Sequence, residues 1–351
     1  MIGFAALGAL DRIFGSRFGI GAEFEKGILT TGQLVLTMAG IMVLAPAIAD
    51  LLVPVISPVY KFLGADPAMF AGSLLAIDMG GAPIAAQLAE GSEAAKVLGG
   101  IITASMLGVT VSFTIPTAMA MTKKEDSGFV AKGILCGIIT IPVGIFFGGI
   151  IAGIDAVYVL RNMIPVAIVS LIVAFGIWKA ERVTLIIFNI FGKIISSVAI
   201  LGLLVAALDF LLGLKPIRNI DSVADSFATI GGIALMLAGA FPLVFILSRL
   251  LKKPLVKLGE KTKMNEAAAI GLISSTVNSL IVFKTLEDMN DRGKVVNMAF
   301  SVSASFALGD HLAYAAGFAP ESILPMVIGK LIAGVSAVFV AILLTRTPKK
   351  A

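Results

Sequence analysis

The chain has 351 residues, of which 58% are hydrophobic and 14% charged, and it carries a formal net charge of +5. Soluble domains contain about 25% charged residues, and the mean hydropathy here is +1.03, so the composition excludes a soluble globular protein and indicates a polytopic membrane protein. The basic residues cluster in short loops, where they act as topology signals rather than as a nucleic-acid-binding surface.

The single cysteine, Cys136, excludes an internal disulfide, and the single histidine, His311, excludes a Cys/His metal cage. We therefore expect no metal and no cofactor. Residues 1–15 lack a basic n-region and a clear cleavage site, so a removed signal peptide is not expected.

Runs of about 20 apolar residues are long enough to cross a bilayer as helices. Residues 1–15 form a short candidate of this kind. The other predicted spans, in chain order, are 27–48, 97–121, 131–154, 157–178, 184–213, 226–248, 295–318 and 321–345. The sequence thus predicts an all-α protein with about nine spans.

Loops rich in lysine and arginine are expected to face the cytoplasm. They are centred on Lys123/Lys124/Lys132, Lys179/Arg182, residues 249–263, Arg292/Lys294 and the tail Arg346/Lys349/Lys350. These positions agree with one another and predict a cytoplasmic C-terminus and an outer N-terminus. Lys215 and Arg218 are the exception, because this scheme places them outside.

Residues 66–88 and 264–286 are long enough to enter the membrane, but the loops that flank each of them fall on one side. Each is therefore predicted to be a re-entrant hairpin, the first from the outer side and the second from the inner side. Each has a polar break near its middle, as expected where the backbone leaves helical geometry and lines a cavity. The breaks are Asp78-Met-Gly-Gly81 and Thr276-Val-Asn-Ser279.

An offset of 198 residues places one break beside the other. The same order of elements, with a short helix, a span, an interfacial stretch, a hairpin and two spans, recurs in both halves. We therefore predict two inverted repeats, as in secondary transporters. The first covers residues 1–154, the linking span 155–183 and the second 184–351.

Asp78 is the only ionisable residue in the run 71–86, and Gly80 and Gly81 follow it. A carboxylate at membrane depth is a functional-site hypothesis, and the simplest one is a counter-ion for a cationic substrate. The alternative is that Asp78 only caps a half-helix.

Asp310 and His311 form a second polar cluster inside a predicted span. Lys330 and Lys193 are also embedded, so Asp310 has an alternative role in a structural charge pair. His311 is a candidate proton carrier, or else a hydrogen-bonded packing residue.

Asn278, Ser279 and Thr276 offer neutral donors and acceptors at the second break, either for a substrate hydroxyl or as helix caps. No H-E-x-x-H or Gly-x-Ser-x-Gly motif is present, so an enzyme is not expected. A second transporter hypothesis makes Asp78 the site of a coupling Na⁺ or H⁺, with another small amine or polar solute as cargo. A cation channel and a homo-oligomer are left open.

Over nearly its whole length the sequence resembles the EutH family of bacterial ethanolamine permeases. The matching stretches are Leu10-Asp-Arg-Ile13, residues 63–81 with Asp78, Asn162-Met-Ile-Pro-Val166, Arg292-Gly-Lys-Val-Val-Asn297, Phe306-Ala-Leu-Gly-Asp-His-Leu312 and Gly329-Lys-Leu-Ile-Ala-Gly334. The family's second break begins Asn-Asn-Ile where this chain has Asn278-Ser-Leu280, so Asn278 carries over and Ser279 departs from the pattern.

The resemblance implies transport of ethanolamine across the bacterial inner membrane. Ethanolamine is an ammonium with a hydroxyl two carbons away, which fits one carboxylate and a few neutral polar groups. We therefore expect Asp78 to bind the ammonium, Asn278 to contact the hydroxyl and Asp310 to line or support the same cavity, with alternating access between the two faces.

Overall fold

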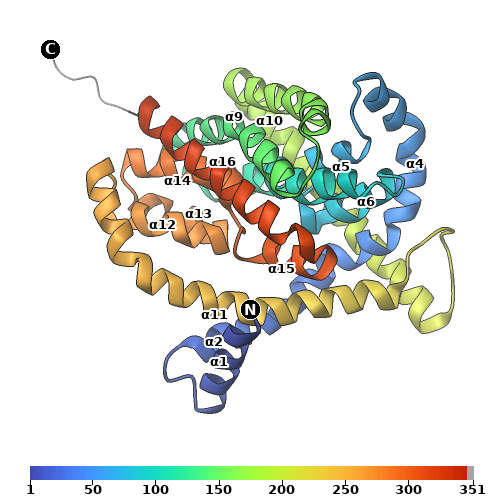
Figure 1. Ribbon diagram of the computed structural model, residues 1–351, viewed down its shortest axis with the longest axis horizontal. Coiled ribbons are helices and arrows are strands. Elements are labelled where there is room, and N and C mark those ends of the chain that lie inside the picture. Colours follow the sequence, from blue (N-terminus) through green and yellow to red (C-terminus); the bar gives the residue numbers. More distant parts are fainter. Residues whose placement is uncertain (346–351) are drawn as a thin grey trace.

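The computed structural model describes residues 1–345, and all the regular elements of this part are helices. In Figure 1, α9, α14 and α16 lie together in the bundle, the long α11 runs along one edge, and α1 and α2 project beyond it. The first half contains α1 (Ile2–Ile13), α2 (Ile20–Leu29), α3 (Thr31–Leu34), η1 (Val35–Ala39), α4 (Gly40–Phe62), α5 (Ala68–Leu74), η2 (Ile77–Gly81), α6 (Ala82–Leu88), α7 (Glu93–Ala95), η3 (Lys96–Gly108), η4 (Thr110–Thr114), α8 (Ile115–Met121), η5 (Lys124–Asp126) and α9 (Ser127–Ile151). The second half contains α10 (Ala156–Leu212), α11 (Val223–Thr262), α12 (Glu266–Val277), α13 (Ser279–Lys284), η6 (Leu286–Asp288), α14 (Asp291–Ala304), α15 (Asp310–Phe318), η7 (Pro320–Ser322) and α16 (Ile323–Leu344).

The helices α9, α14 and α16 pack closely because small residues line their contacts. Gly137 of α9 lies against Val302 of α14, and Gly144 of α9 lies against Gly329 of α16. Such residues let helix backbones approach in a membrane, where burial of apolar surface does not drive helices together. This trio is therefore the packed centre around which the shorter elements are arranged.

The predicted hairpin 66–88 folds as two short helices, α5 and α6, joined by a non-helical turn. Leu75 and Ala76 are extended, and the π-helical turn η2 follows. α5 runs parallel to η3, and α6 runs back beside it. The contacts that show this are Ala68 with Gly99, Leu75 with Gly108, Gly81 with Ala104, and Ala85 with Gly100.

The predicted hairpin 264–286 has the same form, with α12 and α13 separated by an extended residue, Asn278. α12 runs parallel to α14, because Ala268 lies against Gly293 and the N–H of Phe306 donates to the carbonyl of Ser275. The ends of the segment meet where the Asn265 amide donates to the Asp288 carbonyl at 2.7 Å. The entry of the two hairpins into the membrane from opposite sides, and the inverted repeat, stay predictions.

Polar contacts join the loops that the sequence assigns to the same side. Among the predicted inner loops, ion pairs connect Lys294 with Asp126 at 2.6 Å, Lys252 with Glu266 at 3.1 Å, and Lys123 with Glu287. The hydrogen bond and charge of Glu287 raise the pKa of Lys123.

Among the predicted outer loops, Asn162 accepts from the N–H of Asp66 at 2.7 Å, and the Asn219 amide donates to Asp50 at 2.5 Å. The loops thus group as the sequence predicts. Their assignment to the cytoplasmic or outer face stays a prediction.

The structure corrects the predicted spans. Within residues 1–345, seven helices are long and apolar enough to cross a membrane, rather than about nine. They are Ile20–Phe62, Glu93–Met121, Lys124–Ile151, Ala156–Ala180, Arg182–Leu212, Val223–Pro254 and Pro320–Leu344.

The predicted span 295–318 is broken after Ala304, so it consists of α14 and α15. The predicted span 1–15 is represented by α1, whose 12 residues extend only about 18 Å, less than the roughly 30 Å hydrocarbon core. The interfacial stretches expected in the two halves of the predicted repeat are residues 49–63 and 249–263, and the structure makes them continuous with the preceding helices. The basic tail Arg346/Lys349/Lys350 lies outside the described residues.

A glycine contact joins α4 to α10. A methyl group added at Gly40 would overlap the carbonyl oxygen of Ala199 and the backbone nitrogen of Leu203, and Gly202 lies directly against the backbone of Gly40.

Gly40→Ala is therefore expected to destabilise the protein by about 1–3 kcal/mol through overpacking, which thermal unfolding in detergent would measure. Gly231→Ala is the matched control, because nothing lies within 4 Å of an added methyl there. An unchanged unfolding temperature for Gly40→Ala would show that α4 and α10 are not in backbone contact.

Candidate functional site

A cavity of about 640 Å³ lies among the broken helices. It is bounded in the first half by the stretch from α2 to η1 and by η2, η4 and α8. In the second half it is bounded by α10, by the break at Asn278 and by the interruption between α14 and α15. Its lining residues are Thr30, Gln33, Leu34, Thr37, Ala76, Asp78, Met79, Val109, Ser112, Phe113, Pro116, Thr117, Asn189, Gly192, Lys193, Ser196, Ser197, Ile200, Asn278, Leu280, Phe306, Asp310 and His311. The cavity therefore brings together polar groups from both halves of the chain.

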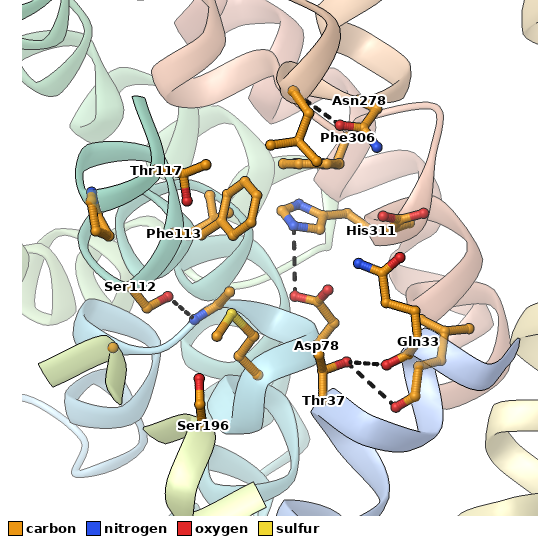
Figure 2. Close-up of a pocket in the computed structure, with 18 of the residues that line it drawn as sticks. Gln33, Thr37, Asp78, Ser112, Phe113, Thr117, Ser196, Asn278, Phe306 and His311 are labelled. Carbon is orange, nitrogen blue, oxygen red and sulfur yellow. Dashed lines mark hydrogen bonds and ion pairs between the residues drawn. The ribbon is translucent and has the colours of Figure 1, made fainter. Parts of the chain in front are cut away.

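Ser112 fixes the first break. The N–H of Ala76 has left the helix and donates to the hydroxyl of Ser112 at 3.0 Å, and this hydroxyl in turn donates to the carbonyl of Gly108 at 2.8 Å. The turn back into α6 passes through Gly80, whose φ of +101° is accessible to glycine without strain. As a result the side chain of Asp78 points into the cavity (Figure 2).

The second break and the interruption between α14 and α15 hold each other. The N–H groups of Phe306 and Leu308 donate to the carbonyls of Ser275 and Thr276 at 3.0 and 2.8 Å. These bonds satisfy carbonyls at the end of α12 and amides of the interruption, as the membrane interior requires. Phe306 adopts a φ of +61°, which is rare for a residue other than glycine.

The centre of the cavity combines one carboxylate, one imidazole and two aromatic rings. The Asp78 Oδ1 atom lies 4.0 Å from Nε2 of His311, which is buried. The ring of Phe306 lies 5.1 Å from the His311 ring and 5.6 Å from the Phe113 ring. Figure 2 shows these rings between Asn278 on one side and Asp78 on the other.

The structure places some of the predicted site residues at the cavity. Asp78, Asn278, Asp310, His311 and Lys193 all line it. Asn278 also caps α13, since its side chain accepts from the N–H of Leu280 at 2.9 Å.

The other predicted site residues do not line the cavity. Gly80 and Gly81 shape the turn behind Asp78. The hydroxyl of Thr276 donates to the carbonyl of Ile273 within its own helix, and Ser279 is fully buried. These residues build the two breaks rather than the cavity wall.

The alternative role of Asp310 in a structural charge pair has no direct contact to support it in this structure. Among the ion pairs within residues 1–345, none joins Asp310 to Lys330 or Lys193 within 4.0 Å. The ammonium of the buried Lys330 donates to the carbonyl of Ser105. Lys193 is exposed.

Several lining residues were missed by the sequence reasoning. Gln33, Thr37, Asn189 and Ser196 lie within apolar helices and carry no motif. Ser112 had one available signal, because the 198-residue offset of the predicted repeat pairs it with Asp310. The repeat itself stays a prediction.

The arrangement is suited to an organic cation. A carboxylate supplies charge, aromatic faces attract cations, and neutral side chains such as Gln33 and Thr37 supply hydrogen bonds. Within the described residues, no group of three His, Cys, Asp or Glu side chains is placed to hold a metal ion.

Across residues 1–345, seven helices long and apolar enough to span and a polar cavity at helix breaks define a helical, multi-pass membrane protein. The chain belongs to the EutH family of ethanolamine utilisation proteins, whose family model matches residues 1–344. This confirms the resemblance seen in the sequence.

Three relatives illustrate the match. The chain is 46% identical to a probable ethanolamine permease EutH of Listeria monocytogenes over 342 residues, covering 97% of this chain and 91% of that protein. It is 41% identical to the protein of the same name from Escherichia coli over 381 residues, covering 98% and 93%. It is 39% identical to the uncharacterized protein YxeR of Bacillus subtilis over 342 residues, covering 97% and 92%. No solved structure gives a significant match.

The hydroxyl of Ser112 is expected to hold the break that presents Asp78. Ser112→Ala would leave the buried N–H of Ala76 without a partner, at a cost of about 1–3 kcal/mol. We expect a lower unfolding temperature in detergent. Ser127→Ala is the control, because its hydroxyl lies at an exposed helix start and donates to Lys124. Equal unfolding temperatures for the two variants would contradict this role of Ser112.

Proposed function

We propose that this protein takes up protonated ethanolamine across the bacterial inner membrane by alternating access, with Asp78 as the counter-ion. The observation that carries the proposal is a cavity-lining carboxylate at a helix break, with no Lys or Arg within 4.0 Å in the described part of the chain. Relatives named probable ethanolamine permeases support the choice of substrate.

The ammonium is assigned to Asp78 because a carboxylate forms strong, charge-assisted hydrogen bonds with N–H donors. Among the ion pairs of residues 1–345, the one that includes Asp78 is its 4.0 Å contact with the imidazole of His311. The aromatic rings of Phe113 and Phe306 border the same space (Figure 2). These rings favour a compact cation over a neutral or anionic solute.

The hydroxyl of ethanolamine is assigned to Gln33 rather than to Asn278. The side-chain oxygen of Asn278 already accepts a hydrogen bond from the N–H of Leu280. The rings of Phe306 and His311 also stand between Asn278 and Asp78 (Figure 2). Gln33 lines the cavity and has no hydrogen bond from its side chain to another described residue. Its amide is therefore free to bind a hydroxyl.

We infer that the cavity opens toward the side that the loop charges assign to the cytoplasm, because two of its lining residues lie close in sequence to basic loops. Thr117 is six residues before Lys123, and Asn189 is seven residues after Arg182. This arrangement corresponds to an inward-facing state. Alternating access requires a second state in which Asp78 is reached from outside.

The counter-ion role is tested by uptake of labelled ethanolamine into proteoliposomes. Asp78→Asn keeps the shape but removes the charge. The loss of a charged hydrogen bond, about 1.5–3 kcal/mol, predicts an affinity about 10- to 100-fold lower. Asp209→Asn near the end of α10 is the control with the same chemistry, and it should transport normally. Unchanged uptake by folded Asp78→Asn would overturn the proposal.

The inward-facing state is tested by cysteine labelling. Cys136 is buried, so a cysteine introduced as Thr117→Cys can be followed with a membrane-impermeant maleimide. We expect labelling in inside-out vesicles and protection in intact cells. Added ethanolamine should slow this labelling. Labelling from the outer side alone would show that the cavity opens outward.

A further inference from the structure

Another pocket lies among the loops that the sequence assigns to the inner side. It has a volume of about 340 Å³ and is formed by α9, α14 and the residues that directly follow α11 and α16. We call it the basic pocket, and its lining residues are Phe129, Lys132, Lys263, Asp291, Arg292, Val295 and Thr345. None of them lines the cavity that holds Asp78, so the basic pocket is a separate site.

The three cations of the basic pocket have no carboxylate partner. Among the ion pairs within residues 1–345, none includes Lys132, Lys263 or Arg292. Basic residues of the neighbouring loops do have such partners. The acidic lining residue, Asp291, is exposed. Three cations and one carboxylate leave the lining with an excess of positive charge.

Backbone carbonyls use only part of the hydrogen-bonding capacity of these cations. Nη2 of Arg292 donates to the carbonyl of Ile342 at 3.0 Å, and Nζ of Lys132 donates to the carbonyl of Leu344 at 3.1 Å. A guanidinium has five N–H groups and an ammonium has three. The Nε atom of Arg292 is buried and has no hydrogen-bond partner in the described chain. Capping the end of α16 thus leaves donors of both side chains for a ligand.

Lys263 reaches the basic pocket from an unusual backbone conformation. It follows α11 with a φ of +60°, at a position where helices commonly have glycine. Its carbonyl accepts a hydrogen bond from the side-chain amide of Asn290 at 2.9 Å, which joins it to the residue before α14. The lysine side chain is exposed and lines the pocket. It supplies a charge that glycine would lack.

The basic pocket adjoins an apolar surface of α16. Leu343 and Leu344 in the last turn of this helix are exposed, and Thr345, the next residue, lines the pocket. Phe339, one turn before Leu343, is exposed as well. In a membrane such side chains contact lipid tails, which are as apolar as leucine. Basic pockets between spanning helices on the cytoplasmic side bind the headgroups of anionic lipids.

We propose that the basic pocket binds the phosphate of an anionic phospholipid from the leaflet that the loop charges assign to the cytoplasm. Lys132, Lys263 and Arg292 provide the positive charge, and a guanidinium can bind two phosphate oxygens at once. The hydrocarbon chains lie along Phe339 and Leu343 of α16. A bound lipid then connects α9, α14 and the ends of α11 and α16. This site is independent of the proposed substrate site.

The test is thermal unfolding of the whole protein in detergent micelles with increasing amounts of phosphatidylglycerol. A ligand that binds only the folded state raises the unfolding temperature as its concentration rises. We expect phosphatidylglycerol to act at a lower mole fraction than phosphatidylcholine with the same acyl chains, because the choline cation is repelled by the lining. Equal stabilisation by the two lipids would overturn the proposal.

The soluble probes are inorganic phosphate and glycerol 3-phosphate, which carry the anionic group without acyl chains. We expect them to raise the unfolding temperature much less than phosphatidylglycerol at the same concentration. If they stabilise the protein as strongly as the lipid does, the ligand is a soluble anion and the proposal is wrong.

Lys263→Gln removes one cation whose side chain has no hydrogen bond in the described chain. The loss of one lysine near a phosphate predicts an apparent affinity for phosphatidylglycerol about fivefold lower. Lys261→Gln is the matched control, because Lys261 is exposed on the last turn of α11 and does not line the basic pocket. Equal affinities of the two variants would indicate diffuse attraction to a basic surface and contradict the proposal. The comparison of lipids with wild-type protein decides if Lys263→Gln does not fold.

Discussion

The structure depends on how peptide groups are satisfied where helices stop inside an apolar protein. In hydrocarbon an unpaired N–H or C=O costs several kcal/mol, so each break needs a partner from another element. Ser112 supplies one for Ala76, and the carbonyls of Ser275 and Thr276 supply two for the segment 305–309. These contacts make the breaks stable, and the breaks create the cavity. Asp78 faces the cavity because its segment is held open in this way.

The same contacts explain why the two halves of the chain meet at one place. The first break is held by Ser112 of η4, and the second break is held by the interruption between α14 and α15. Phe113 from the first half and Phe306 from the second then come into edge contact. A cation bound at Asp78 would therefore touch both halves, which is the arrangement that alternating access needs.

Much of this architecture could be predicted from the sequence. Apolar length predicted most of the long helices, and isolated polar residues predicted both breaks. The interruption at 305–309 could not be predicted, because its break depends on hydrogen bonds to carbonyls of α12. The contact of Lys330 with the Ser105 carbonyl could not be predicted either, since a sequence shows that a lysine is embedded but not which carbonyl it faces. Gln33 and Thr37 carried no pattern at all, because single polar residues in a span become a site only through tertiary contact.

The backbone contact between Gly40 and Gly202 has a mechanical consequence. Most packed helices interlock through side chains that must leave their grooves before one helix can move past another. At this crossing the backbones of Gly40 and Gly202 touch directly, so neither of these two residues has a side chain that must leave a groove if α10 shifts. Small shifts of packed helices are a common way to open or close a site. The cavity wall formed by α10 is thus fixed to α4 partly through a contact between two backbones.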